Sequence, residues 1–241
     1  MPDVLIQNPV INSPFREPER HFVFGDEGIT NEIATGRRPS SFFSPVAASR
    51  RKGGQLQFDT EWTRDRIQEN PTVNDIRRRV EAWREGKYAG VTPMTARLLQ
   101  YWTDERRERR LFFCQIEALE TAIYLTEVAK KYGDAWIENR LRDANDTANP
   151  GLPRVAFKMA TGSGKTVVMG MLIAWQALNK QDNPQDARFG DAFLVVTPGI
   201  TIKDRLRVLF PNDPENYYKQ LDILPPDLRE RLRQAKIIVT N

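Results

Sequence analysis

Cysteine and histidine are nearly absent from this sequence, which has one of each in 241 residues, Cys114 and His21. A single cysteine excludes an internal disulfide framework. One cysteine and one histidine also cannot supply the ligands of a structural zinc site. We therefore expect a fold that depends on neither cross-links nor zinc.

Long apolar runs are absent as well. No stretch has the length that a bilayer span needs, and the N-terminus, Met-Pro-Asp-Val-Leu, lacks the basic start and apolar core of a signal peptide. These absences predict a cytoplasmic protein with no membrane partner. The net charge of +4 is weak support for a polyanionic partner.

The sequence does contain a glycine-rich octapeptide, Met159-Ala-Thr-Gly-Ser-Gly-Lys-Thr166, between an apolar β-like run and a long apolar helical run. Glycines let several backbone N–H groups converge on one anion, and the following helix adds its dipole. Lys165 can reach the β- and γ-phosphates, and the Thr166 hydroxyl can ligate Mg²⁺. The octapeptide predicts binding of a nucleoside triphosphate with Mg²⁺. The alternative is a Gly-Ser turn with a chance lysine.

From residue 154 onward, apolar strand-like runs alternate with helical runs. We expect strands at residues 155–159, 192–197 and 236–240, and helices at residues 164–178, 201–210 and 225–234. Such alternation implies parallel strands with a ligand at their C-terminal ends. The predicted fold class is α/β with an incomplete parallel sheet.

Residues 1–104 are expected to form an irregular and helical N-terminal region. Prolines break residues 1–60, and helices are expected at 74–83, begun by Asn74 or Thr72, and at 92–102, begun by Thr92. Two further helices are expected, near residues 111–128 and 135–144.

We expect the segment at residues 36–45 to be extended chain, and its role has two interpretations. In the first, it is a strap that docks Phe42 and Phe43 on a core. In the second, it contacts nucleic acid through its aromatic rings and nearby cations. The cations are Arg37, Arg38, Arg50, Arg51 and Lys52.

Two further signals flank the octapeptide. Gln115 lies near the start of an amphipathic helix, where a carboxamide can pair with adenine N6 and N7 while Phe112 or Phe113 stacks on the base. The alternative is an ordinary surface glutamine. The turn Thr197-Pro-Gly-Ile-Thr-Ile202 follows a strand and offers backbone N–H groups to a nucleic-acid phosphate, or it is a plain turn with Thr201 as helix cap.

The spelling Ala160-Thr-Gly-Ser-Gly-Lys-Thr166 resembles motif I of superfamily 2 helicases and translocases. Residues 110–241 resemble the first half of the N-terminal RecA-like domain of a DEAD/DEAH-type motor. The resemblance is nearest to the type III restriction enzyme Res subunit and the UvrB-like helicase N-terminal domain group. It implies an accessory region at residues 1–104 and the first part of a RecA-like domain at residues 105–241.

The resemblance also implies roles for single residues. Thr161, Gly162, Ser163 and Gly164 would cradle phosphates by backbone N–H groups, Lys165 would stabilise phosphate charge and Thr166 would hold Mg²⁺. Gln115 would sense adenine, with Phe113 as the stacking ring. Thr197, Pro198, Gly199 and Lys203 correspond to motif Ia, which contacts nucleic acid. Double-stranded DNA and a modification or specificity subunit would be partners.

The sequence departs from the family pattern in three places. Met159 occupies the position of the first glycine in the common phosphate-loop motif, and Phe112 occupies the position where the family has an arginine. No acidic box follows the strand at residues 236–240, so the sequence looks truncated.

Three functions remain open at this point. The first is the ATP-binding N-terminal portion of an ATP-dependent DNA helicase or translocase. The second is a non-catalytic nucleotide- or DNA-binding module from a truncated reading frame. The third, which leaves the Thr197 turn unexplained, is a small-molecule kinase.

Overall fold

A computed structural model describes residues 6, 8–25, 28–43, 67–152 and 154–241. Contacts within the chain divide it into two compact units, Met1–Arg78 and Arg79–Asn241. The family resemblance implies a boundary between residues 104 and 105, whereas the contacts divide the chain between Arg78 and Arg79, inside helix α1.

The first unit contains two small antiparallel sheets. Strand β1 (Arg20–Gly25) pairs with β2 (Gly28–Thr35), and β3 (Ser41–Phe43) pairs with β4 (Ile67–Glu69). Asn12 holds the start of β1, because its Oδ1 accepts hydrogen bonds from the backbone N–H groups of Glu19 and Arg20, both at 3.0 Å.

The expectation of irregular chain over residues 1–60 is wrong where these strands form. The prolines that suggested it, at positions 9, 14, 18, 39 and 45, all lie outside β1, β2 and β3. Because proline removes a backbone donor only at its own position, the proline-free stretch between Pro18 and Pro39 can pair as a hairpin.

The strap interpretation also fails for one of its anchors. The Phe42 side chain is 49% exposed, so it does not dock in a core. The Arg37 guanidinium pairs with Glu17 at 2.9 Å, and Arg38 lies 3.9 Å from the ring centroid of Phe24. Arg50, Arg51 and Lys52 lie outside the described residues.

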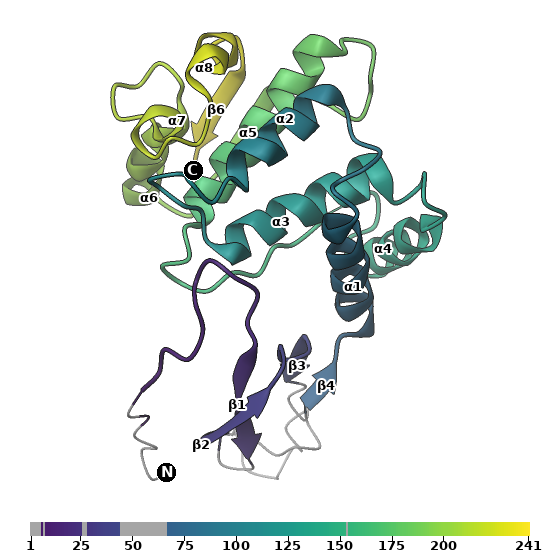
Figure 1. The fold of residues 1–241 in the computed structure, drawn as a ribbon. Coiled ribbons are helices and arrows are strands. Elements are labelled where there is room, and N and C mark those ends of the chain that lie inside the picture. Colours follow the sequence, from purple (N-terminus) through teal and green to yellow (C-terminus); the bar gives the residue numbers. More distant parts are fainter. Residues whose placement is uncertain (1–5, 7, 26–27, 44–66, 153) are drawn as a thin grey trace, which may run out of the picture. The chain divides into compact units, whose positions relative to one another are not determined.

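Helices form most of the second unit (Figure 1). None of the helices among the described residues is both long and apolar enough to cross a membrane. The helices up to the sheet are α1 (Pro71–Glu85), α2 (Pro93–Trp102), α3 (Phe113–Ile123), the π-helical turn η2 (Tyr124–Val128), α4 (Ala135–Ala148) and α5 (Lys165–Asp182). The shorter helices after it are α6 (Ile200–Arg205), the 3₁₀ turn η3 (Leu206–Leu209), α7 (Tyr217–Gln220) and α8 (Pro226–Leu232).

The first two helices show how side chains set helix starts. Thr92 caps α2 as expected, because its hydroxyl accepts from the Thr95 N–H at 3.1 Å. For α1 the expected caps are wrong. Asn70 accepts from the Val73 N–H at 3.2 Å, while Asn74 accepts from the backbone N–H of Ser40 at 2.7 Å.

Helix α5 is the centre of the second unit. It is apolar around most of its circumference, and it contacts α2, α3, α7 and α8. Met171, Ala174 and Leu178 have no exposed surface. A helix that is covered by neighbours on several faces has to be apolar on all of those faces, because a polar side chain there would be removed from water.

The sheet of the second unit has two parallel strands, β5 (Ala192–Val196) and β6 (Lys236–Thr240). Leu194, Val196 and Ile238 lie on one face of this sheet and are each more than 60% exposed. The strand expected at residues 155–159 is not formed. Among the described residues no strand pairs with this segment, so its backbone groups cannot join a ladder.

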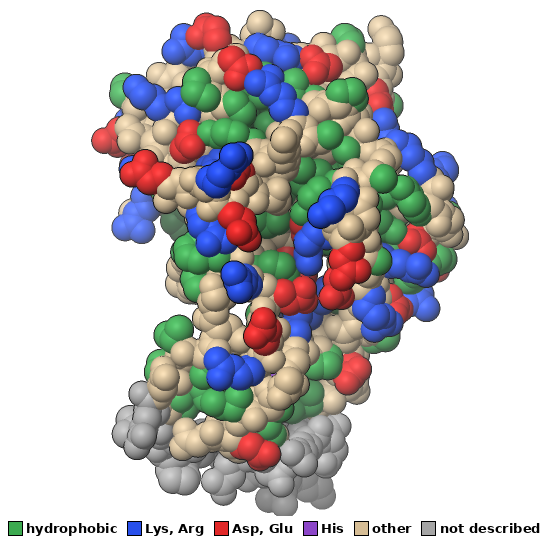
Figure 2. All heavy atoms as spheres, viewed as in Figure 1, with side chains coloured by type: hydrophobic (Ala, Val, Ile, Leu, Met, Phe, Trp, Pro, Cys, Tyr) green, Lys and Arg blue, Asp and Glu red, His purple; other side chains and the backbone are tan. Residues whose placement is uncertain are grey.

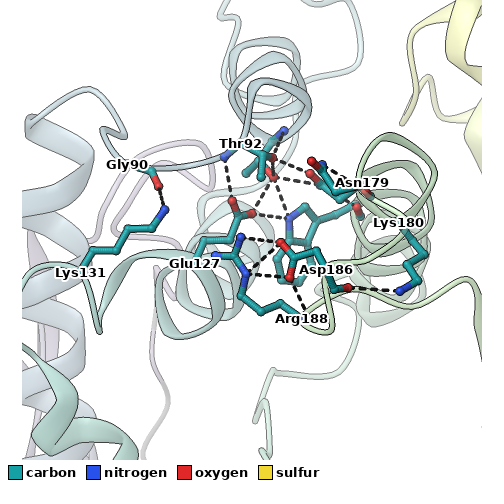
Figure 3. Close-up of polar contacts among 11 residues, drawn as sticks. Gly90, Thr92, Glu127, Lys131, Asn179, Lys180, Asp186 and Arg188 are labelled. Atoms are coloured by element: carbon teal, nitrogen blue, oxygen red, sulfur yellow. Dashed lines mark hydrogen bonds and ion pairs between the residues drawn. The ribbon is translucent and has the colours of Figure 1, made fainter.

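A buried carboxylate joins three helical elements (Figure 3). Glu127, in η2, is 2% exposed. It accepts hydrogen bonds from the Thr92 N–H at 2.8 Å, the Thr95 hydroxyl at 2.6 Å and the Trp175 indole at 2.9 Å. Asn179 extends the network by donating to the Thr95 hydroxyl at 2.9 Å. The start of α2 is thereby fixed against η2 and α5.

Replacing Glu127 by alanine should lower the free energy of unfolding by about 3 kcal/mol, because the substitution removes hydrogen bonds from the Thr92 N–H, the Thr95 hydroxyl and the Trp175 indole and leaves a gap in the core. Urea unfolding followed by tryptophan fluorescence measures this loss. Glu138→Ala, at a 62% exposed side chain of α4, is the matched control and should change stability by less than about 0.5 kcal/mol. Equal effects of the two substitutions would contradict the network.

Candidate functional site

The glycine-rich loop at residues 160–164 leads directly into α5. Gly162 and Gly164 both have φ of +79°, a left-handed conformation that disfavours residues with a side chain. The first N–H groups of a helix lack a carbonyl from an earlier turn. In α5 the N–H groups of Val167 and Val168 donate to the Gly164 carbonyl at 2.9 and 3.3 Å, which leaves the very start of the helix, at Lys165 and Thr166, as the part that faces the loop. The loop and the helix start therefore bring backbone donors together, as an anion-binding site requires.

Gly164 is also the point where α3 comes closest to the loop. A Cβ atom at this position would clash with Nε2 of Gln115. No such obstacle exists at Gly162, where a Cβ would meet nothing within 4 Å. Gly164 is therefore required twice, by its backbone conformation and by the approach of Gln115.

Polar side chains of the loop bond to the loop backbone. Lys165 is exposed, and its Nζ donates to the Ala160 carbonyl at 2.9 Å. The Ser163 hydroxyl donates to the same carbonyl at 2.6 Å. Thr161 is exposed and Thr166 is half-exposed at the start of α5. The Lys165 amine thus lies beside the concave backbone of the loop.

Gln115 contacts the loop, and the alternative of an ordinary surface glutamine is wrong. It is 5% exposed, and both ends of its carboxamide are used. Nε2 donates to the Ser163 carbonyl at 3.0 Å, and Oε1 accepts from the Phe112 N–H at 2.9 Å. Gln115 therefore caps the start of α3 and ties it to the loop.

Phe113, the expected stacking ring, is half-buried in the first turn of α3. The Arg84 guanidinium lies 5.0 Å from its ring centroid. Sequence reasoning missed Arg84, because α1 is far from α3 in sequence and Arg84 stands among other arginines of α1 that carry no distinguishing pattern.

Arg84 is held by Glu120 on α3, which has no exposed surface. Nε and Nη2 of Arg84 bond to the two carboxylate oxygens at 2.9 and 2.7 Å, and the Tyr88 hydroxyl donates to Oε1 at 2.6 Å. Burial by itself lowers the pKa of Arg84, but the hydrogen bond and charge of Glu120 outweigh it and raise that pKa. Burial raises the pKa of Tyr88, and Glu120 adds to the effect. Arg84 thus stays charged and Tyr88 stays a donor.

The residues expected to contact nucleic acid, in the turn after β5, differ in their exposure. Thr197 is 6% exposed, and its hydroxyl donates to the Gly199 carbonyl at 3.2 Å. Pro198 is exposed, and Gly199 and Lys203 are half-exposed. Gly199, rather than Thr201, is the N-cap residue of α6. Pro198 and Lys203 are thus open to a partner, while Thr197 shapes the turn.

The residues present at the loop fit a triphosphate with its magnesium ion. Two loop glycines have the left-handed backbone that turns the chain tightly, the adjoining helix is 18 residues long, and Lys165 supplies a positive charge beside the loop. Thr166 offers a hydroxyl oxygen, which is a ligand that Mg²⁺ accepts.

The model of one protein family, described as "Type III restriction enzyme, res subunit", matches residues 108–241. This range contains the loop, Gln115, Phe113 and the turn after β5. No match was found among curated proteins or among solved structures.

The two loop glycines form a matched pair for testing the contact with Gln115. Gly162→Ala should lower the free energy of unfolding by about 1 kcal/mol, through its left-handed backbone alone. Gly164→Ala should lower it by about 1–3 kcal/mol more, since the new methyl group displaces Gln115 from Ser163. Equal losses in urea unfolding would contradict the close approach.

Proposed function

The chain belongs to the family of the res subunit of type III restriction enzymes, and from that premise we propose that it is the ATP-binding part of an ATP-dependent DNA helicase or translocase of a restriction system. The observation that carries the proposal is the glycine cradle at the start of α5 with Lys165 beside it. We assign residues 105–241 to a RecA-like domain, whose parallel sheet would include β5 and β6, and residues 1–104 to an accessory region.

Each residue of the loop has a role in this proposal. Residues 161–164 hold the phosphates through backbone N–H groups, Lys165 neutralises charge on the outer phosphates, and Thr166 ligates Mg²⁺. Hydrolysis of the bound triphosphate is the source of the free energy that such a motor uses. The role of this chain's own residues is to bind and orient the phosphates.

Recognition of adenine would involve Gln115 and Phe113. The carboxamide of Gln115 already bonds to Phe112 and Ser163, so pairing with adenine would require it to exchange those partners. Phe113 faces no such requirement, because stacking uses the face of a ring and not a hydrogen bond. We therefore propose stacking on Phe113 as the main contact with the base, and a coupling role for Gln115.

Double-stranded DNA is the proposed track, contacted near the turn after β5. Lys203 and Arg205 lie in α6, and Arg207 follows in η3. In the view of Figure 2, positive and negative side chains are interspersed over the second unit. Contact with DNA would therefore depend on local cations near the turn rather than on a broad positive field. A modification or specificity subunit is the proposed protein partner.

Lys165→Ala should weaken ATP binding about ten-fold or more, because a charge-assisted contact to phosphate is lost. Its stability should hardly change, since the bond from Nζ to Ala160 lies at an exposed position. Titration calorimetry with MgATP measures affinity, and urea unfolding checks the fold. Lys219→Ala, an exposed lysine of α7, is the control and should bind as the unaltered chain does. Unchanged affinity in Lys165→Ala would rule out the phosphate site.

The DNA contact is tested by its dependence on salt. If Lys203 meets a DNA phosphate, Lys203→Gln should reduce the slope of log affinity against log salt by about one. Fluorescence anisotropy with a labelled duplex measures the slope, with Lys219→Gln as the control. The same slope in both variants would place the DNA contact elsewhere.

A further inference from the structure

A three-part contact joins α1 to the expected base-binding end of α3. The Arg84 guanidinium lies 5.0 Å from the ring centroid of Phe113 and is bound by both carboxylate oxygens of Glu120. Two hydrogen bonds to one carboxylate fix the plane of the guanidinium as well as its position. The cation beside the Phe113 ring is therefore held in place rather than mobile.

The same helix connects this contact to the phosphate loop. Phe113, Gln115 and Glu120 all belong to α3, and Gln115 donates to the Ser163 carbonyl in the loop. Phe113 is two positions before Gln115, in the same first turn of α3. Stacking on Phe113 requires that a base linked to phosphates in the loop reaches this turn of α3.

We propose that Arg84 is a positioning residue for nucleotide binding, which holds the Phe113 ring in place as the platform on which the base stacks. Attraction between a guanidinium and an aromatic face restrains the ring, and a ring that is already ordered loses less entropy when a base stacks on it. Glu120 acts one step further back by holding Arg84. The proposal rests on the proposed function, because it needs a nucleotide in the loop.

The contribution of the base can be separated from that of the phosphates by comparing two ligands. Inorganic tripolyphosphate presents the phosphate groups alone, and MgATP adds the nucleoside. The ratio of the two dissociation constants, measured by calorimetry on the whole chain, is a base advantage. A purely structural role of Arg84 would alter both ligands or neither, so the base advantage distinguishes positioning from general support.

Arg84 cannot simply be removed, because Glu120 would remain as a buried, unpaired carboxylate. The test therefore uses the double variant Arg84→Met/Glu120→Gln, compared with the unaltered chain. The double variant should lose about three- to ten-fold in base advantage while its affinity for tripolyphosphate stays within about two-fold of the unaltered chain. Glu120→Gln alone, which weakens the hold on Arg84 but leaves its cation, should lose less base advantage than the double variant. Urea unfolding confirms that both variants fold.

Two further variants identify the route of the effect. Phe113→Leu should lose the same base advantage, and adding it to the double variant should cause no additional loss, because Arg84 acts through the ring. Tyr88→Phe removes a hydrogen bond to Glu120 without touching the Phe113 ring, so it should leave the base advantage unchanged.

Five results would overturn the proposal. An unchanged base advantage in the folded double variant would leave Arg84 with a structural role only. Equal weakening of both ligands would place its effect on the loop. A larger loss when Phe113→Leu is added would show that Arg84 does not act through the ring. Equal binding of MgATP and tripolyphosphate by the unaltered chain would remove the base site but leave the phosphate site standing, whereas binding of neither ligand would refute the proposed function itself.

Discussion

The approach of Gln115 to Gly164 is the constraint on which the rest of the site depends. The amide nitrogen of Gln115 lies where a Cβ of residue 164 would be, so a side chain at position 164 would push the Gln115 carboxamide out of its present place. The bond from that carboxamide to the Ser163 carbonyl connects the first turn of α3 to the loop before α5. Together with the packing of α3 on α5, this contact fixes the turn that carries Phe113 relative to the glycine-rich loop.

Two buried glutamates, Glu127 and Glu120, fix the positions of the helices around that contact. Glu127 fixes the start of α2 against α5, and Glu120 fixes α1 against α3 through Arg84. Replacing a buried ion pair by apolar side chains often costs little stability, so such a pair is weak as a source of stability alone. Its value here is geometric, since the guanidinium that satisfies Glu120 is also the cation beside Phe113.

The loop, its helix and the strands at residues 192–197 and 236–240 could be predicted because their signals are local. Glycine spacing, apolar runs and the Thr92 cap each act over a few residues. The hairpin of β1 and β2 was missed because prolines outside it dominated the composition of residues 1–60. The strand at residues 155–159 was expected from its apolar side chains, but a strand also needs a partner, and pairing is not encoded in the segment itself.

The site divides in the same way. The residues that we propose to bind phosphate lie in one octapeptide, so the proposal could be made from the sequence. Arg84 and Phe113 meet across separate helices, and no local pattern marks either as half of a pair. The structure also shows that the loop carbonyls already have side-chain donors, which the sequence does not reveal. Lys165 and Gln115 both bond to loop carbonyls, at Ala160 and Ser163. A phosphate that draws Lys165 away from Ala160 leaves that carbonyl with the Ser163 hydroxyl as its donor, while the Gln115 bond holds the loop to α3. Binding would thus exchange one hydrogen bond for a charged contact without releasing the helix that carries Phe113.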